Sequence, residues 1–254
     1  MQLPRSIWAY GVGLAATTVG LFVGCAAPSS PVDADAIDVS YYNWWNFYRR
    51  GASFLEQGRT EQAMEDFERC LGLRPGANYA EPRDLWRIRT YGMHFLEDYF
   101  PHRELGVARV RLGRPAEAIP LLEQSIGQTP SGRAKYYLNR ARRAVLRDVP
   151  TSKPETRLHG DSHQVWSRDR FRILEGVARG EGFIEEIVVN GQRQFIELAE
   201  QEVPFQQRIE LQAGGNAVHI MVKDLLGQVT DTRVEWIADW SPPQLDVHRV
   251  EKQG

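Results

Sequence analysis

Cysteine is scarce in this chain, and its charges nearly balance. The 254 residues contain two cysteines, Cys25 and Cys70, and six scattered histidines. Two cysteines exclude a framework of several disulfides and a zinc site built from several cysteines. The formal net charge is −2, so global electrostatics predict no nucleic-acid partner.

The sequence motifs of common catalytic sites are also missing. The chain has no HExxH zinc motif, no GxSxG nucleophile elbow, no P-loop and no GxGxxG dinucleotide motif. We therefore expect a protein that is not an enzyme and needs no cofactor. The segment HGDSH (159–163) places two histidines around an aspartate. No third ligand is indicated, so a solvated loop is favoured over a metal site.

A run of nineteen uncharged residues follows the single positive charge near the N-terminus. Arg5 precedes residues 6–24, SIWAYGVGLAATTVGLFVG, whose length suits a membrane-spanning helix or a secretory signal. The run ends in FVGC (22–25), which resembles the lipobox of bacterial lipoproteins. The resemblance implies cleavage before Cys25, lipidation of Cys25 and attachment to the membrane of the bacterial cell envelope. An uncleaved anchor helix is the alternative.

Residues 25–40 are expected to form a flexible tether. After Cys25 the stretch contains Pro, Ser and Asp and almost no large apolar side chain, a composition that does not support a packed core. Ala26 stands where an aspartate would favour retention in the inner membrane of some bacteria. The lipoprotein resemblance therefore favours the outer membrane facing the periplasm, with the cell surface as the alternative.

One pattern occurs twice, 55 residues apart, in residues 51–75 and 106–130. Small residues in such a pattern let two helices approach, a large apolar residue fills the groove between them, and proline ends the second helix. The spacing resembles the tetratricopeptide repeat, which implies helix pairs at about 44–77 and 99–132. The matched positions are Gly51 and Gly106, Gly58 and Gly113, Ala63 and Ala118, Phe67 and Leu122, and Pro75 and Pro130.

Two further segments show helical patterns of their own. In residues 78–98, apolar residues recur at three- and four-residue steps, which predicts a helix that Pro101 kinks or restarts. Ser131 is the expected cap of another helix, which runs to about residue 148 and has an apolar face and an arginine-rich face. We interpret this helix as the end cap of the array. Its basic face is expected in solvent rather than against an acidic partner or lipid headgroups.

The aromatic run YYNWWNFYRR (41–50) is expected to supply core residues, with a stacking surface for a peptide or sugar as the alternative. Cys70 is expected to be a small buried thiol rather than a reactive one. In tetratricopeptide proteins, ligands usually lie on the concave face formed by the first helices. Carried over by alignment, the candidate partner-binding groove consists of Trp45, Tyr48, Ala52, Leu55, Arg103, Val107, Val110 and Arg111.

From about residue 150 the pattern changes to short alternating runs separated by turn residues. Residues 171–180 and 182–198 are predicted strands, and Asn190-Gly191 is a strong hairpin signal. Some seven strands in this region predict a β-sandwich. The order of an L-x-G motif, IVVNG (187–191) and V-x-D-x-x-G (222–227) resembles bacterial immunoglobulin-like modules.

The sequence therefore predicts an all-α tetratricopeptide-type array followed by an all-β immunoglobulin-like sandwich. We expect a non-enzymatic, lipid-anchored envelope adaptor that binds a protein or peptide through the array, with the sandwich as spacer or second contact. A glycan- or peptidoglycan-binding protein is one alternative. An accessory subunit of an envelope enzyme or of a secretion or pilus assembly system is another. The expected parts are a signal peptide (1–24), the tether (25–40), the array (41–148), a linker (149–153), the sandwich (154–240) and a tail (241–254).

Overall fold

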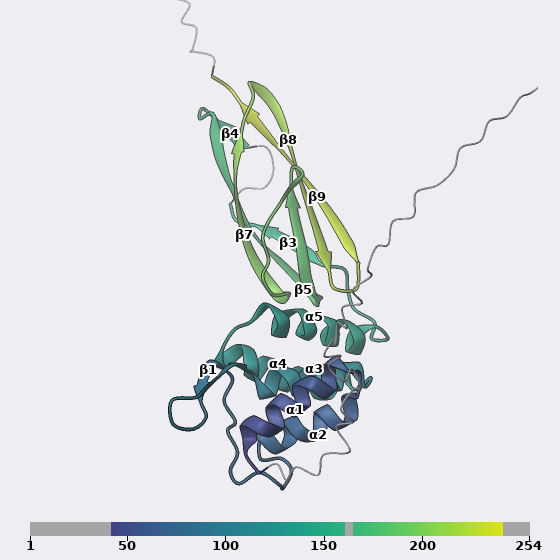
Figure 1. Cartoon of the computed structure of the whole chain (residues 1–254). Coiled ribbons are helices and arrows are strands. Elements are labelled where there is room, and N and C mark those ends of the chain that lie inside the picture. The colour runs from purple at the N-terminus through teal and green to yellow at the C-terminus, as the bar shows by residue number, and fades with distance from the viewer. Residues whose placement is uncertain (1–41, 161–164, 241–254) are drawn as a thin grey trace, which may run out of the picture. The chain divides into compact units, whose positions relative to one another are not determined.

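A computed structural model describes residues 42–160 and 165–240 of the chain (Figure 1). The predictions for the signal peptide, the tether and the C-terminal tail concern residues outside this set, as do those for most of the HGDSH segment. Among the described residues, no helix is both long and apolar enough to cross a membrane.

Helices dominate the described chain up to residue 146. Helix α1 packs against α2, α3 against α4, and α4 against α5 (Figure 1). The first four helices fall within the two predicted repeats, and α5 is the predicted additional helix. Their bounds are α1 Trp44–Glu56, α2 Thr60–Cys70, α3 Pro101–Arg111, α4 Pro115–Gln128 and α5 Gly132–Leu146.

Glycine lies against a large apolar residue in both helix pairs, as predicted. A Cβ atom at Gly51 would lie 3.0 Å from Cε1 of Phe67, and one at Gly106 would lie 2.7 Å from Cγ of Leu122. Phe67 and Leu122 are both fully buried. Because glycine has no side chain, each pair of helices can pack at this short distance.

Pro101 and Ser131 stand at the starts of two helices, and the predicted Ser131 cap is confirmed. Pro101 occupies the first turn of α3, where its missing N–H leaves no hydrogen bond unmade. Ser131 caps α5, and its Oγ accepts a hydrogen bond of 3.3 Å from the backbone N of Ala134. The cap satisfies one of the free N–H groups at the helix end.

The predicted helix within residues 78–98 is wrong. This segment forms an antiparallel hairpin of β1 (Leu85–Arg89) and β2 (Phe95–Tyr99). Gly92 takes a φ of 53° in the connecting turn, which glycine tolerates without strain. Ile88 pairs with Leu96 in register, and both side chains are buried against the helices. Ile88 and Leu96 therefore lie on the buried face of a hairpin, although the spacing of the apolar residues in this segment also fits a helix.

The region after residue 154 is rich in β-sheet. Its strands are β3 Glu155–Leu158, β4 Val165–Ser167, β5 Phe171–Val189, β6 Gln192–Arg193, β7 Glu200–Glu210, β8 Gly214–Asp224 and β9 Val229–Ala238. They form a seven-stranded sheet in which β3, β5, β8, β9 and β4 follow one another, while β6 and β7 pair with β5.

Strand β5 is continuous where the sequence predicted two strands. Its first half pairs with β3 and β7, and its second half pairs with β6 and β8. The register shifts between Arg179 and Ile184, and Phe183 takes a φ of 59°. A β-bulge of this kind bends a strand without ending it, so one strand joins two groups of neighbours.

Two other predictions for this region are confirmed. Asn190 and Gly191 both have positive φ, and Val189 pairs with Gln192, which makes a two-residue hairpin turn. Strand β8 alternates as expected: Val218, Ile220 and Val222 are buried in the core of the sheet region, while residues 217 and 219 are exposed.

Candidate functional site

A hollow of about 560 Å³ opens beside α1, α3 and the β1–β2 hairpin. We call it the α1–α3 hollow. Its lining combines exposed charged side chains with apolar and small residues. The lining includes Tyr48, Arg49, Ala52, Ser53, Leu55 and Glu56 of α1, Leu96 and Asp98 of β2, Arg103, Glu104 and Arg111 of α3, and Arg133 of α5.

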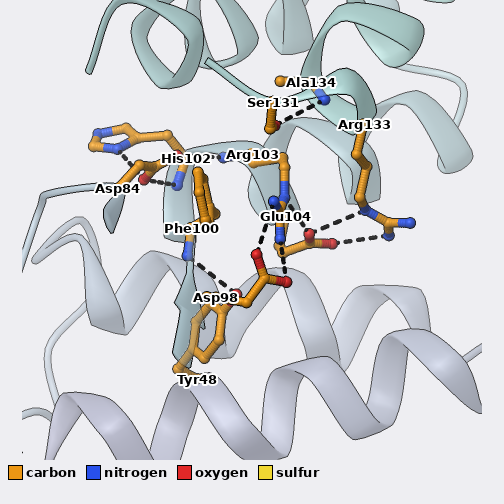
Figure 2. Close-up of polar contacts among 10 residues, drawn as sticks. All are labelled: Tyr48, Asp84, Asp98, Phe100, His102, Arg103, Glu104, Ser131, Arg133 and Ala134. Atoms are coloured by element: carbon orange, nitrogen blue, oxygen red, sulfur yellow. Dashed lines mark hydrogen bonds and ion pairs between the residues drawn. The ribbon is translucent and has the colours of Figure 1, made fainter. Parts of the chain in front are cut away.

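A buried arginine, Arg103, lines this hollow. Nη1 and Nη2 of Arg103 donate to the carboxylate of Asp98 at 3.2 and 2.9 Å, and Nε donates to Glu104 at 2.7 Å (Figure 2). Arg133 donates to both oxygens of the Glu104 carboxylate, from Nε to Oε1 at 3.1 Å and from Nη2 to Oε2 at 3.0 Å. These ion pairs, in the order Asp98, Arg103, Glu104 and Arg133, link β2, α3 and α5. Bidentate pairs between arginine and carboxylate fix the geometry of both side chains.

Arg103 remains charged although only 4% of its surface is exposed. Burial lowers the pKa of its guanidinium, but the hydrogen bonds with Asp98 and the charge of Glu104 outweigh burial and leave the pKa raised. The guanidinium also lies 3.9 Å from the centre of the Phe100 ring. Arg103 therefore forms a rigid wall of the hollow rather than a freely moving contact.

Tyr48 joins α1 to this network. Its hydroxyl donates to the carbonyl of Asp98 at 2.6 Å and accepts from the backbone N of Phe100 at 3.1 Å (Figure 2). Burial, followed by the negative charge of Glu104, raises the pKa of the Tyr48 hydroxyl. The hydroxyl therefore stays protonated, which keeps the donated hydrogen bond to residue 98 in place.

Asp84 holds the start of α3 from outside the helix. Its carboxylate accepts hydrogen bonds from the backbone N of His102 at 3.0 Å and of Arg103 at 3.2 Å, and Oδ1 lies 2.9 Å from Nδ1 of His102 (Figure 2). A negative group at this end suits the helix dipole. Asp84 thus fixes the position from which the Arg103 side chain extends.

Five of the eight candidate groove residues line the α1–α3 hollow. They come from two first helices, as the alignment with tetratricopeptide repeats implied. Tyr48 and Arg103 are almost fully buried, whereas Arg111 is exposed and donates to the carbonyl of Leu55 at 2.8 Å. The five residues are Tyr48, Ala52, Leu55, Arg103 and Arg111.

The other three candidates lie elsewhere. Val107 is fully buried in the helical core, so the expectation that it faces a partner is wrong. Helices α2, α4 and α5 all contact α3, and Val107 belongs to the apolar core of this region. Trp45 is half-buried, with its ring 6.1 Å from that of Tyr91 on the hairpin. Val110 lines a second hollow.

The second hollow, of about 550 Å³, lies beside the end of α3, the C-terminal half of α5 and β5. We call it the α5 hollow. Its lining includes Val110, Gly113, Tyr136, Asn139, Arg140, Arg143, Arg147 and Glu185. The sequence does not predict this hollow, because the pattern of α5 indicates an end cap of the array. The available signal was the arginine spacing along this helix.

The basic face of α5 is not simply solvated, as the sequence had led us to expect. Arg143 donates to the carbonyl of Leu225 and to the carboxylate of Glu185, each at 2.7 Å. Arg142 donates to the carbonyl of Ala199 at 2.8 Å. Two arginines of the helical part therefore bind the β-sheet region directly.

Most of the described part of the aromatic run lies in the core, and Cys70 is buried, as the sequence predicts. Trp44 and Phe47 are 1% and 4% exposed, so this run is largely core. Cys70 is fully buried, and its thiol donates to the carbonyl of Trp44 at 3.2 Å. Burial raises the pKa of this thiol. Tyr42 at the start of the run is 56% exposed, and on the hairpin Trp86 and Tyr91 are both more than half exposed.

Among solved structures, the chain is similar to the fibronectin(III)-like modules of CbhA from Clostridium thermocellum, with 15% identity and a TM-score of 0.27. The match covers 38% of this chain and 53% of that chain, so this chain spans about half the length of the CbhA structure. CopC from Methylosinus trichosporium OB3b shares 15% identity at a TM-score of 0.22, with 37% of this chain and 100% of that chain covered. No curated protein matches.

The family model described as "Tetratricopeptide repeat" matches residues 46–76. This range holds most of α1 and all of α2, the pair in which Gly51 packs on Phe67. Residues 46–76 are therefore similar to a tetratricopeptide repeat, within a region of five helices that precedes a β-sheet-rich region.

Proposed function

We propose that this protein is a non-enzymatic, lipid-anchored adaptor of the bacterial cell envelope that binds a protein partner through the α1–α3 hollow. Tetratricopeptide repeats generally mediate protein–protein interactions. The observation that carries the proposal is the position of the hollow, which opens on the first helices of two successive helix pairs. Five residues expected at such a surface line it.

The chemistry of the hollow suits a peptide segment with both polar and small apolar side chains. Arg49, Glu56 and Arg111 are exposed around it, while Ala52 and Leu96 supply apolar surface. Arg103 and its carboxylate partners are already held in place, so a partner would bind without first ordering them. The volume falls in the range of about 300–1,000 Å³ typical of ligand sites.

We assign the β-sheet-rich region as an immunoglobulin-like module that acts as a spacer or second contact. The support is the sharing of β5 between two groups of strands, together with a buried core that includes Leu174, Ile187 and Trp236. The sequence order of turn and strand motifs supports the same assignment.

The anchor is proposed from the FVGC sequence at 22–25, with outer-membrane attachment facing the periplasm. Cells grown with a radioactive fatty acid should label the wild-type protein and not the Cys25→Ser variant. An unlabelled wild type would favour the uncleaved helix instead. Several acyl chains on one cysteine would hold the protein firmly, because a single chain gives only marginal binding.

A pulldown from crosslinked cell envelopes tests the adaptor role. The wild-type chain should recover a specific protein partner, and the double variant Arg49→Glu with Arg111→Glu should lose it. A matched control is Arg157→Glu with Arg168→Glu, which reverses two exposed arginines of the β-sheet region. Recovery of no partner by the wild type, or equal loss in both double variants, would contradict the proposal.

A glycan-binding role is the second candidate, and the β1–β2 hairpin is the observation that favours it. Trp86 is 56% exposed and Tyr91 57% exposed, and exposed aromatic rings can stack on sugars. If this role is correct, the protein should sediment with purified peptidoglycan, and Trp86→Ala should reduce the sedimented fraction. Absence of cosedimentation removes this candidate.

A further inference from the structure

We infer that the α5 hollow binds an acidic, extended segment of a partner protein, between α5 and the β-sheet region. The inference rests on the proposed function, because it supplies the chemistry of one contact with that partner. It concerns a different surface from the α1–α3 hollow, so the two can be tested separately.

Three arginines line the α5 hollow from one face of the helix. Arg140, Arg143 and Arg147 are separated by three and four residues, a spacing that aligns side chains on one face. From Arg140 to Arg147 the helix rises by about 10 Å. A row of this length matches two carboxylates on alternate residues of an extended chain, since such residues lie about 7 Å apart.

The positive charge in the hollow is only partly neutralised. Glu185 is an acidic lining residue, and it pairs with Arg143 at 2.7 Å. Within residues 42–160 and 165–240, Arg140 and Arg147 have no ion-pair partner. Both side chains are exposed, so each guanidinium is free to pair with an incoming carboxylate.

An uncharged acceptor in the hollow also lacks a partner. Oδ1 of Asn139 is buried and accepts no hydrogen bond, whereas most buried polar atoms are hydrogen-bonded. Tyr136, which is 62% exposed, offers an aromatic surface beside it for the aliphatic part of a side chain.

The shape favours a peptide over a membrane surface or a small anion. A bilayer is broad and flat, whereas these arginines border a recess that β5 closes on one side through Glu185. A phosphate ion is much shorter than the row of about 10 Å. An extended acidic peptide can place one carboxylate near Arg140 and another near Arg147.

Glu185 gives the proposal a sharp test because it competes with the ligand. Its carboxylate occupies the Arg143 guanidinium that an acidic segment would also use. Glu185→Gln removes this competitor and keeps the side-chain size. Arg143 still donates to the carbonyl of Leu225, so the arginine should remain in position.

Fluorescence anisotropy of the purified full chain in detergent measures the binding. The probe is a labelled ten-residue peptide that alternates Glu with Ala, and the control peptide has Gln in place of Glu. We expect the Glu peptide to bind and the Gln peptide to bind at least about tenfold more weakly. Arg140→Glu with Arg147→Glu should weaken the Glu peptide by a similar factor, and Glu185→Gln should strengthen it severalfold.

The matched control is Arg168→Glu, an exposed arginine of the β-sheet region, which should leave the affinity unchanged. Thermal unfolding of each variant checks that the fold is retained. Equal binding of both peptides, or no effect of the Arg140 and Arg147 reversals, would overturn the inference. Full displacement of the Glu peptide by millimolar phosphate would also overturn it. Full displacement by vesicles of anionic lipid, together with equal binding of the Glu and Gln peptides, would do the same.

The experiment separates this inference from the proposed function. If the envelope pulldown recovers a partner through the α1–α3 hollow and the Glu peptide fails to bind, the inference is wrong and the function stands. If the Glu peptide binds with the expected variant pattern and no envelope partner is recovered, the α5 hollow stands and the adaptor role fails.

Discussion

Gly106 of α3 lies against Leu122 of α4, where a Cβ atom would stand 2.7 Å from Cγ and 2.9 Å from Cδ2 of the leucine. Leu122 is fully buried and has little room to move. This contact sets how closely the second helix pair packs. It thereby positions α3, whose Arg103 and Arg111 line the α1–α3 hollow.

Gly106→Ala should lower the free energy of unfolding by up to about 2 kcal/mol. The added methyl overpacks the helix contact at a cost of about 1–3 kcal/mol, which exceeds the gain in helix propensity of about 1 kcal/mol. Gly127 of α4 is the control, since a Cβ there meets nothing within 4 Å. Gly127→Ala should stabilise slightly. Chemical denaturation of both variants measures the difference, and equal effects would contradict the packing account.

Arg103→Met should destabilise the helical region strongly, by about 3 kcal/mol. The substitution leaves the Glu104 carboxylate, which is 6% exposed, with Arg133 as its remaining arginine partner. Asp98→Asn is the comparison, because the side chain of Asp98 is 57% exposed and such pairs contribute less than about 1 kcal/mol. Similar losses in the two variants, read from urea unfolding, would show that burial does not decide the strength of this network.

Cys70 should resist thiol reagents in the folded protein. Burial raises the pKa of its thiol, so the thiol is neutral at pH 8 and remains so at pH 9, and its sulfur is also inaccessible. In a Cys25→Ser chain, a colorimetric disulfide reagent should react with Cys70 only after addition of guanidinium chloride. Rapid reaction of the native protein would refute the buried-thiol interpretation.

Asp224→Ala should destabilise the β-sheet region by about 1–2 kcal/mol. The buried carboxylate accepts hydrogen bonds from the backbone N of Leu226 at 3.0 Å and of Gln228 at 2.8 Å, which closes the turn between β8 and β9. Asp231 is exposed, so Asp231→Ala should change stability by less than about 0.5 kcal/mol. Thermal unfolding followed by circular dichroism compares the two, and a larger loss at Asp231 would count against this role.

The repeat pattern was predictable because its physical basis is local. A small residue packs on a large one at fixed spacing, as Gly51 does on Phe67, and the turn residue Gly58 takes positive φ. The Asn190-Gly191 hairpin was predictable for the same reason, since its φ angles favour those two residues.

The β1–β2 hairpin was not predictable from periodicity alone. Ile88 and Leu96 are buried because they meet the helical core, a tertiary contact that overrides the helical spacing of the same segment. The α5 hollow was missed for a related reason: Glu185 is distant in sequence from Arg143, so their ion pair is visible only once α5 and β5 are placed together.

Site-specific photocrosslinking in living cells tests the adaptor role most directly. A photoreactive residue in place of exposed Ser53, which lines the α1–α3 hollow, is compared with one in place of exposed Asp231 on β9. The proposed function predicts a discrete crosslinked protein species from position 53 and none from position 231. No crosslinked species from position 53, with the protein present at its normal level, would contradict it.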